Sequence, residues 1–207
     1  MLEYMAIEVI VFDLGKVIFD FDINKLSTRL HLSSQRSKQD IVDLISGHRD
    51  LFINYEKGLI TSQEFYNQMT ILLSLQIDYK SFCDIWNDIF TPFHDMIDFI
   101  NILSKKYNLA ILSNTNDLHF DYLQNKYPEI FAYFKYLHLS YKMKSRKPDA
   151  EIYKKVIDFY NIEPASIFFT DDLEKNINSA KELNISAFKF EGLKKLKEDL
   201  NSLGVVV

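Results

Sequence analysis

The chain has 207 residues, of which 47% are hydrophobic and 26% charged, and its formal net charge is -5. Such a chain can bury a core, which excludes an intrinsically disordered protein. A pI near 5.5 disfavours nucleic acid or an anionic membrane as a partner. The one cysteine, Cys83, excludes an intrachain disulfide, and neither a basic nor an apolar leader segment opens the chain. No apolar run approaches the ~20 residues of a membrane span, so we expect a folded cytoplasmic protein.

Short runs of β-branched and aromatic residues alternate with longer segments of helical period. In chain order, the clearest runs are residues 9–12, 109–112, 136–139, 167–169 and 186–190. Most are apolar without a break, which is typical of strands covered by helices on both faces of a parallel sheet. The sequence therefore predicts an α/β fold with a Rossmann-like, doubly wound parallel sheet.

The gap between the first two predicted strands is about a hundred residues, far longer than one crossover connection. The pattern from residue 23 to residue 90 is helical throughout. One stripe of apolar residues at helical spacing consists of Phe65, Met69, Leu72 and Leu73. We expect residues 21–90 to form a helical cap domain, inserted into an α/β core domain of residues 1–20 and 91–207.

Two helix starts are predicted within this insert. Thr61-Ser62-Gln63-Glu64 has the pattern of a capping box, in which the threonine hydroxyl and the glutamate carboxylate satisfy backbone amides. Ser81-Phe82-Cys83-Asp84 is expected to open a further helix in the same way. Both starts favour helices that bury one apolar face.

Polar side chains stand where the predicted strands end or in the loops that follow. They are Asp13, Ser113, Asn114, Lys147, Asp171 and Asp172. Singly, each has an ordinary role, since Asp and Ser are common helix N-caps and a lysine can be a solvated loop charge. In an open parallel sheet, however, the carboxyl ends of the strands meet at one edge, where ligands bind.

Three carboxylates at one edge of a sheet repel each other unless a cation is bound, and oxygen ligands of this kind suit Mg²⁺. A hydroxyl, exposed amides and a lysine beside the metal form a receptor for a phosphate dianion. A carboxylate that the metal does not fully engage can then attack phosphorus. The set of side chains predicts metal-assisted phosphate chemistry.

The order and spacing of these motifs resemble the haloacid dehalogenase-like (HAD) hydrolase superfamily. Its four motifs are similar, in order, to residues 11–17 around Asp13, to Leu112-Ser113-Asn114, to Lys147-Pro148, and to Asp171-Asp172 with Asn176. The insert lies where this family places a type-one helical cap. More narrowly, residues 55–61, 113–119, 127–130 and 139–148 resemble the bacterial glucose-1-phosphate phosphatase subgroup.

The resemblance implies a Mg²⁺-dependent phosphatase that hydrolyses a small phosphorylated metabolite such as a sugar phosphate. Asp13 would attack phosphorus and form an aspartyl-phosphate. Mg²⁺ would be held by Asp13, the backbone carbonyl of Gly15 and Asp172, and Asp171 would orient the ligands or the lysine from behind.

The same resemblance assigns the phosphate receptor. Ser113, the Asn114 amide and Lys147 would hold the phosphoryl oxygens, because stabilising their charge is most of the catalytic task in phosphoryl transfer. The small phosphorylated substrate is the one partner that these motifs imply. They give no indication of the oligomeric state.

Gly15 departs from the pattern of most phosphatases in the superfamily, which carry a second Asp there as general acid and base. Glycine cannot carry a proton, and the loss of such help typically costs about 10²–10⁴-fold in rate. The glucose-1-phosphate phosphatase subgroup also has Gly at this place, which favours slow or differently assisted catalysis over an inactive site. Asp20 and Asp22 are the nearest spare carboxylates, with His119 as a further candidate, although Asp20 more simply braces the hinge into the cap.

Two other functions stay open at this point. A 2-haloacid dehalogenase also lacks the second Asp and uses no metal, but it would not need the acidic pair Asp171-Asp172. A catalytically degenerate phosphate-binding or regulatory protein would explain Gly15. Four cap residues, Phe52, Tyr55, Glu56 and Trp86, lie where the family sets leaving-group specificity. We interpret the aromatic ones as cap core and assign none of the four to the site.

Overall fold

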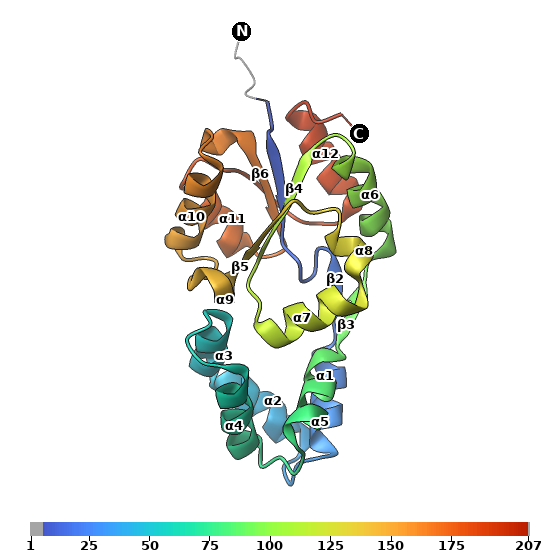
Figure 1. The fold of residues 1–207 in the computed structure, drawn as a ribbon, viewed down its shortest axis with the longest axis vertical. Coiled ribbons are helices and arrows are strands. Elements are labelled where there is room, and N and C mark those ends of the chain that lie inside the picture. Colours follow the sequence, from blue (N-terminus) through green and yellow to red (C-terminus); the bar gives the residue numbers. More distant parts are fainter. Residues whose placement is uncertain (1–5, 207) are drawn as a thin grey trace.

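The computed structural model describes residues 6–206 (Figure 1). Residues 1–5 and Val207 lie outside the described residues. The two ends of the predicted core domain and the expected absence of a leader segment concern these residues. The main sheet has five strands, all paired in parallel, in the order β5-β4-β1-β6-β7. They are β1 (Val9–Phe12), β4 (Asn108–Ser113), β5 (Tyr136–Leu139), β6 (Ile167–Asp171) and β7 (Ser186–Lys189). The predicted parallel sheet is confirmed.

Helices cover both faces of the sheet because its strands are apolar on both sides. In β1, Ile10 and Phe12 point to one face and Val9 and Val11 to the other, and all four are buried. The first face packs against α6 (His94–Ser104), α7 (Asp117–Lys126), α8 (Pro128–Phe131) and α12 (Leu193–Ser202). The second packs against α10 (Ala150–Tyr160) and α11 (Glu174–Lys181). Two short elements complete this part: α9 (Ser140–Met143) and the 3₁₀ turn at Pro164–Ser166.

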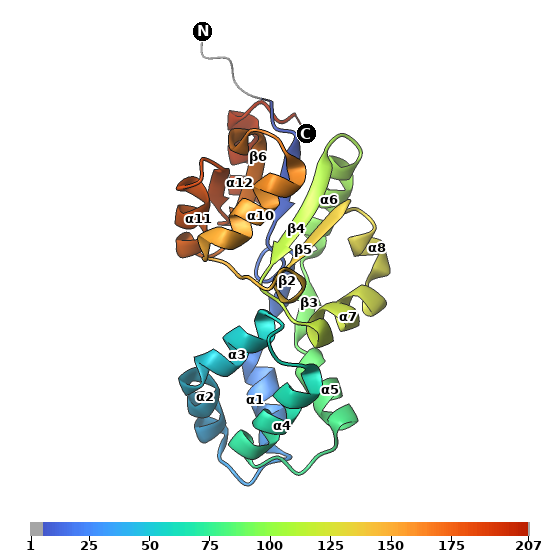
Figure 2. The same cartoon turned by 60° about the vertical axis from the view of Figure 1, so that its left-hand side comes forward.

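A two-stranded antiparallel ribbon connects the insert to the sheet. It consists of β2 (Phe19–Phe21) and β3 (Phe90–Pro92), which the sequence analysis did not predict. Between these strands lie five helices, which we call the cap helices: α1 (Ile23–His31), α2 (Lys38–Gly47), α3 (Arg49–Glu56), α4 (Ser62–Leu73) and α5 (Tyr79–Asn87). Figure 2 shows them below the carboxyl edge of the sheet.

The cap helices pack around an apolar cluster of their own. Phe65 lies within it, fully buried, and stacks on Tyr55 with ring centroids 4.2 Å apart. In the predicted stripe Phe65, Met69 and Leu73 are buried, whereas Leu72 is half-buried. The domain boundaries at residues 20/21 and 90/91 stay a prediction, and both fall within the ribbon.

One of the two predicted helix starts is confirmed. Thr61 and Glu64 form the capping box at the start of α4. The second prediction was wrong, because α5 begins at Tyr79 and its N-cap is Asp78, whose carboxylate accepts a hydrogen bond of 2.8 Å from the Ser81 amide. Asp is as favourable as Ser at the N-cap position, so the helix begins directly after Asp78. None of the helices within residues 6–206 is both long and apolar enough to cross a membrane.

Candidate active site

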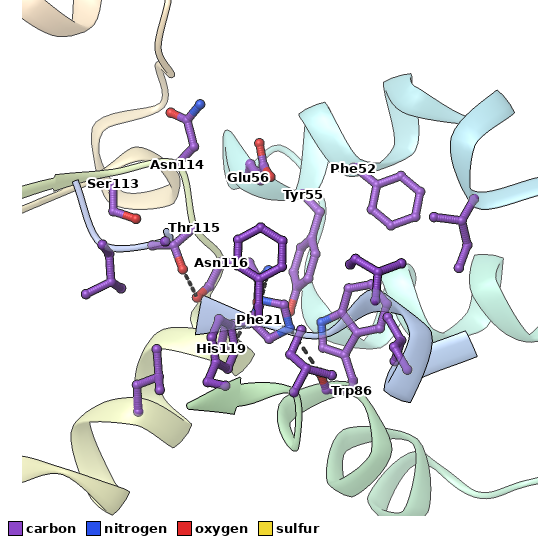
Figure 3. A pocket seen from close by; sticks show the side chains of 18 residues that line it. Phe21, Phe52, Tyr55, Glu56, Trp86, Ser113, Asn114, Thr115, Asn116 and His119 are labelled. Carbon is purple, nitrogen blue, oxygen red and sulfur yellow. Dashed lines mark hydrogen bonds between the residues drawn. The ribbon is translucent and has the colours of Figure 1, made fainter. Parts of the chain in front are cut away.

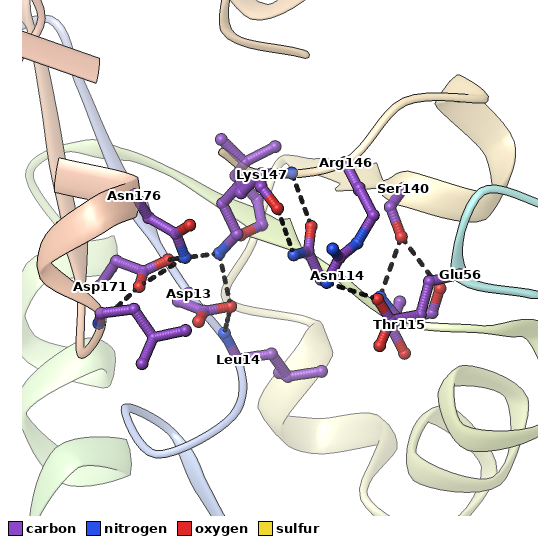
Figure 4. A network of polar contacts seen from close by, with 12 residues as sticks. Asp13, Leu14, Glu56, Asn114, Thr115, Ser140, Arg146, Lys147, Asp171 and Asn176 are labelled. Atoms are coloured by element: carbon purple, nitrogen blue, oxygen red, sulfur yellow. Dashed lines mark hydrogen bonds and ion pairs between the residues drawn. The ribbon is translucent and has the colours of Figure 1, made fainter. Parts of the chain in front are cut away.

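The carboxylates predicted at the strand ends converge at one edge of the sheet, and Figure 4 shows two of them, Asp13 and Asp171, beside Lys147. Asp13 directly follows β1, Asp171 ends β6, and Asp172 is the next residue. Oxygen atoms from these three side chains lie within 4.8 Å of one another. The topology brings them together because β1 and β6 are neighbours in the sheet.

Lys147 lies between two of these carboxylates and is only 1% exposed. Its Nζ is 2.8 Å from Asp13 Oδ1 and 2.6 Å from Asp171 Oδ2, and it donates to the Leu112 carbonyl at 2.7 Å. The contacts with Asp171 and with the Leu112 carbonyl are hydrogen bonds, and the contact with Asp13 is an ion pair. Burial alone would lower the pKa of Lys147, but the charges of Asp13 and Asp171 outweigh it and raise that pKa. The lysine is therefore a fixed positive charge.

The two neighbouring acids differ in how fully they are engaged. Asp171 is 0% exposed and accepts hydrogen bonds from the Leu173 amide and from Asn176 Nδ2, in addition to Lys147. Asp172 is half-buried, and burial together with the charge of Asp171 raises its pKa. Asp171 thus positions its neighbours, whereas Asp172 keeps oxygen atoms for a further ligand.

Asp13 is held in an orientation that leaves part of its carboxylate free. Its Oδ1 accepts from the Leu14 amide at 2.7 Å and forms an ion pair with Lys147. Burial, with the charge of Asp171, raises the pKa of Asp13 to about 7 in spite of the opposing effect of Lys147. The three carboxylates carry more negative charge than the one ammonium group of Lys147 can neutralise at this edge of the sheet. Their oxygen atoms are suitable ligands for a hard divalent cation. The residues present fit Mg²⁺.

The two residues after β4 have different surroundings. Ser113 ends the strand and is buried. The side chain of Asn114 pairs with the backbone of Lys147: its Nδ2 donates to the Lys147 carbonyl and its Oδ1 accepts from the Lys147 amide, both at 2.8 Å. This side chain fixes the lysine loop, so the backbone amide of Asn114 is the group that stays available for the predicted phosphate contact.

Several contacts of the site were not predicted. Ser140 Oγ accepts from the Thr115 amide at 2.9 Å and donates to the Thr115 carbonyl at 3.0 Å, which fixes the loop after β4. Arg146, next to the lysine, lies 2.8 Å from Glu56 at the end of cap helix α3. The Arg146 and Glu56 charges are ninety positions apart in the sequence, and no motif or period connects them.

A cavity of about 240 Å³ lies between the cap helices and this edge of the sheet (Figure 3). Gly15, Ser113 and Asn114 line it on the core side, and aromatic residues of the cap line it opposite. A Cβ atom at Gly15 would lie 3.1 Å from the ring of Phe21. The space that a larger residue would need at position 15 is thus partly taken by the ribbon.

Comparisons with known proteins agree with this geometry. A model of the haloacid dehalogenase-like hydrolase family matches residues 7–184. The chain is 28% identical over 193 residues to a D-ribitol-5-phosphate phosphatase of Bacteroides thetaiotaomicron, covering 88% of this chain and 91% of that protein. The solved structure of a HAD family enzyme of the same organism, in complex with magnesium and inorganic phosphate, matches with a TM-score of 0.80 and 30% identity over 92% of this chain and 99% of that one.

An L-2-haloacid dehalogenase of Xanthobacter autotrophicus with chloropropionic acid covalently bound is a more distant match. Its TM-score is 0.64 at 16% identity, covering 97% of this chain and 85% of that one. This likeness concerns the fold alone. The family model spans most of the chain, so the chain belongs to the haloacid dehalogenase-like hydrolase family, as its motifs predicted.

Proposed function

We propose that this protein is a Mg²⁺-dependent phosphatase that hydrolyses a small phosphorylated sugar or sugar alcohol. The observation that carries the proposal is the cluster of Asp13, Asp171 and Asp172 around one buried lysine. Leu14 and Gly15, which follow Asp13 in the chain, line a small cavity. The similar D-ribitol-5-phosphate phosphatase and the similar structure with magnesium and phosphate support it.

Asp13 is the proposed nucleophile. The Leu14 amide and Lys147 both bind its Oδ1, which leaves Oδ2 as the attacking atom. In the first step the Oδ2–phosphorus bond forms as the ester bond of the substrate breaks, giving an aspartyl-phosphate. Water then attacks phosphorus, which releases inorganic phosphate and restores the carboxylate.

The phosphoryl group would contact Lys147, the Ser113 hydroxyl and the Asn114 amide, which stabilise the charge on its equatorial oxygens. Mg²⁺ would be held by Asp13, the Gly15 carbonyl and Asp172, and when bound it supplies positive charge that draws the dianion to the nucleophile and favours the ionised carboxylate. Asp171 would hold the lysine in place.

The volume of the cavity limits the size of the leaving group. Its volume of about 240 Å³ suits a molecule of sugar size, and the loop after β4 offers polar groups beside the aromatic wall. We further propose that the protein acts in the cytoplasm, without a nucleic acid or membrane partner, which its acidic pI and single cysteine support.

Phosphate release tests the proposal. Purified protein would be assayed with Mg²⁺ on p-nitrophenyl phosphate and on a panel of sugar and sugar-alcohol phosphates. We expect turnover that is lost in Asp13→Asn and on addition of EDTA, and that is kept in Asp20→Asn, since Asp20 is exposed and paired with Lys16. Turnover on none of these substrates, or turnover that survives Asp13→Asn, would overturn it.

The dehalogenase alternative is weaker, because a metal-free reaction gives no reason for Asp172 to lie beside Asp13 and Asp171. It predicts chloride release from 2-chloropropionate that EDTA does not affect. The same preparations serve for this assay, with Asp13→Asn as the inactive control.

A further inference from the structure

The proposed reaction needs a proton for the leaving group, and Gly15 cannot give it. The departing alkoxide of a sugar or sugar alcohol is a strong base, so its ester bond breaks slowly unless an acid protonates the oxygen. Inserting a carboxylate at position 15 would crowd the ring of Phe21. The proton donor must therefore come from another part of the cavity wall.

The two spare carboxylates near the nucleophile are committed elsewhere. Asp20 is exposed, pairs with Lys16 and accepts from the Phe21 amide, and its pKa is lowered by the lysine. Asp22 caps helix α1 by accepting from the Lys25 amide. Neither residue lines the cavity.

His119 lines the cavity, but its ring is fixed as a neutral group. Nε2 is 3.1 Å from the Trp86 carbonyl and must donate to it, so Nδ1 accepts from Asn116 Nδ2 at 3.2 Å. Burial lowers the pKa of His119 to about 4. Both ring nitrogens are occupied within the protein, which leaves no proton to transfer.

Within residues 6–206, the cavity is lined by one residue with a carboxylate side chain, Glu56, and by no lysine or arginine. Its side chain is 27% exposed, and Figure 3 shows its carboxylate close to the end of the cavity where Ser113 and Asn114 lie. Arg146 holds Oε2 at 2.8 Å, which leaves Oε1 for another partner. Burial raises the pKa of Glu56, although Arg146, Lys147 and Lys175 oppose the shift.

We propose that Glu56, delivered by cap helix α3, is the acid and base that position 15 lacks; this inference rests on the proposed phosphatase function. The Glu56 carboxyl gives its proton to the ester oxygen as the bond from that oxygen to phosphorus breaks and the Asp13–phosphorus bond forms. The resulting carboxylate accepts a proton from water as that water attacks the aspartyl-phosphate. Glu56 is then restored to its acid form.

The ion pair between Glu56 and Arg146 makes the position of the proposed acid depend on the position of the cap. Arg146 is adjacent to Lys147, so the ion pair that orients Glu56 is anchored on the lysine loop of the core. Lys57, the residue after Glu56, pairs in turn with Asp149 at 2.8 Å. Two consecutive cap residues thus contact the core on both sides of the catalytic lysine, and the acid is in place only when the cap lies against the core.

The dependence on leaving group tests the assignment. Nitrophenolate leaves without protonation, whereas the alkoxide of D-ribitol 5-phosphate needs it. We expect Glu56→Gln to slow the phosphorylation of Asp13, measured as alcohol release in a single turnover, by about 10²–10⁴-fold on D-ribitol 5-phosphate and by less than about threefold on p-nitrophenyl phosphate. Hydrolysis of the aspartyl-phosphate, which the two substrates share, should slow on both. Glu182→Gln, which makes the same change at an exposed glutamate of the core, should alter neither rate.

Three outcomes would overturn the inference. An equal fall in the phosphorylation rate on both substrates would mean that Glu56 only shapes or orders the site, and unchanged rates of both steps would mean that it takes no part. A wild-type protein that hydrolyses no substrate of the panel, or does so without Asp13, would instead refute the proposed phosphatase, and the assignment of Glu56 with it. The first two results leave the phosphatase proposal standing, so the failures are distinguishable.

Discussion

Replacing Asp13 with asparagine should stabilise the metal-free protein while abolishing turnover. In the folded chain the pKa of Asp13 is raised from 3.8 to about 7, chiefly by burial. One pKa unit corresponds to about 1.4 kcal/mol, so the ionised carboxylate opposes folding by about 4 kcal/mol above neutral pH. Asparagine has nearly the same shape and no charge. We therefore expect Asp13→Asn to raise the free energy of unfolding by about 2–4 kcal/mol near pH 8.

The gain should depend on pH in one direction. The folded protein binds the Asp13 proton more tightly than the unfolded chain does, so the contribution of Asp13 to stability falls as the pH rises from about 4 to about 7. The gain from Asp13→Asn should therefore be small near pH 4 and complete above pH 7. Urea unfolding in EDTA, followed by the fluorescence of the single tryptophan, Trp86, measures it.

Asp20→Asn is the matched control. It makes the same chemical change at an exposed carboxylate whose pKa is lowered, chiefly by its hydrogen bond with Lys16, so asparagine there should not stabilise the protein at any pH. The reasoning fails if Asp13→Asn gives no gain near pH 8, or if its gain is as large near pH 4.

Further predictions concern the lysine, the cap core and the contact between cap and core. Lys147→Met leaves two buried carboxylates unpaired and should cost about 3–5 kcal/mol in urea unfolding, whereas Lys142→Met, at an exposed position, should cost little. Phe65→Ala should cost about 3–5 kcal/mol by leaving a cavity among the cap helices, measured by circular dichroism. Gly58 has φ +62°, and a Cβ there would clash with the backbone of α9, so Gly58→Ala should lower kcat/KM on a sugar-alcohol phosphate by more than about tenfold. Gly204→Ala, where φ is +76° but space is open, should cost stability without that loss of activity.

The strands of the main sheet could be predicted because their uninterrupted apolar residues indicate burial on both faces. Residues 9–12 are apolar without a break, and the structure buries them on both faces. The ribbon strand Phe19–Phe21 could not be predicted, since three residues with one polar member between two aromatic ones fit a loop as well as a strand. Its pairing with Phe90–Pro92 depends on residues about seventy positions away.

The site divides along similar lines. Asp13, Lys147 and Asp171 could be predicted to meet, because the topology of a parallel sheet brings strand ends together whatever the details of packing. Glu56 was not assigned to the site from the sequence, since its place in the cavity wall depends on how the cap helices fold over the sheet. Its partner Arg146 is found only in three dimensions.

Gly15, Phe21 and Glu56 belong to one arrangement. The ring of Phe21, on the ribbon that connects core and cap, approaches the position that a side chain at residue 15 would take. An aromatic ring thus lies where an acidic side chain at position 15 would extend, and it also makes the cavity less polar. The proposed acid on the cap then acts from the wall of the enclosed cavity, where few water molecules compete for its proton. The proposed function and the departure at Gly15 are consistent if the cap supplies both the shape of the leaving-group site and its proton.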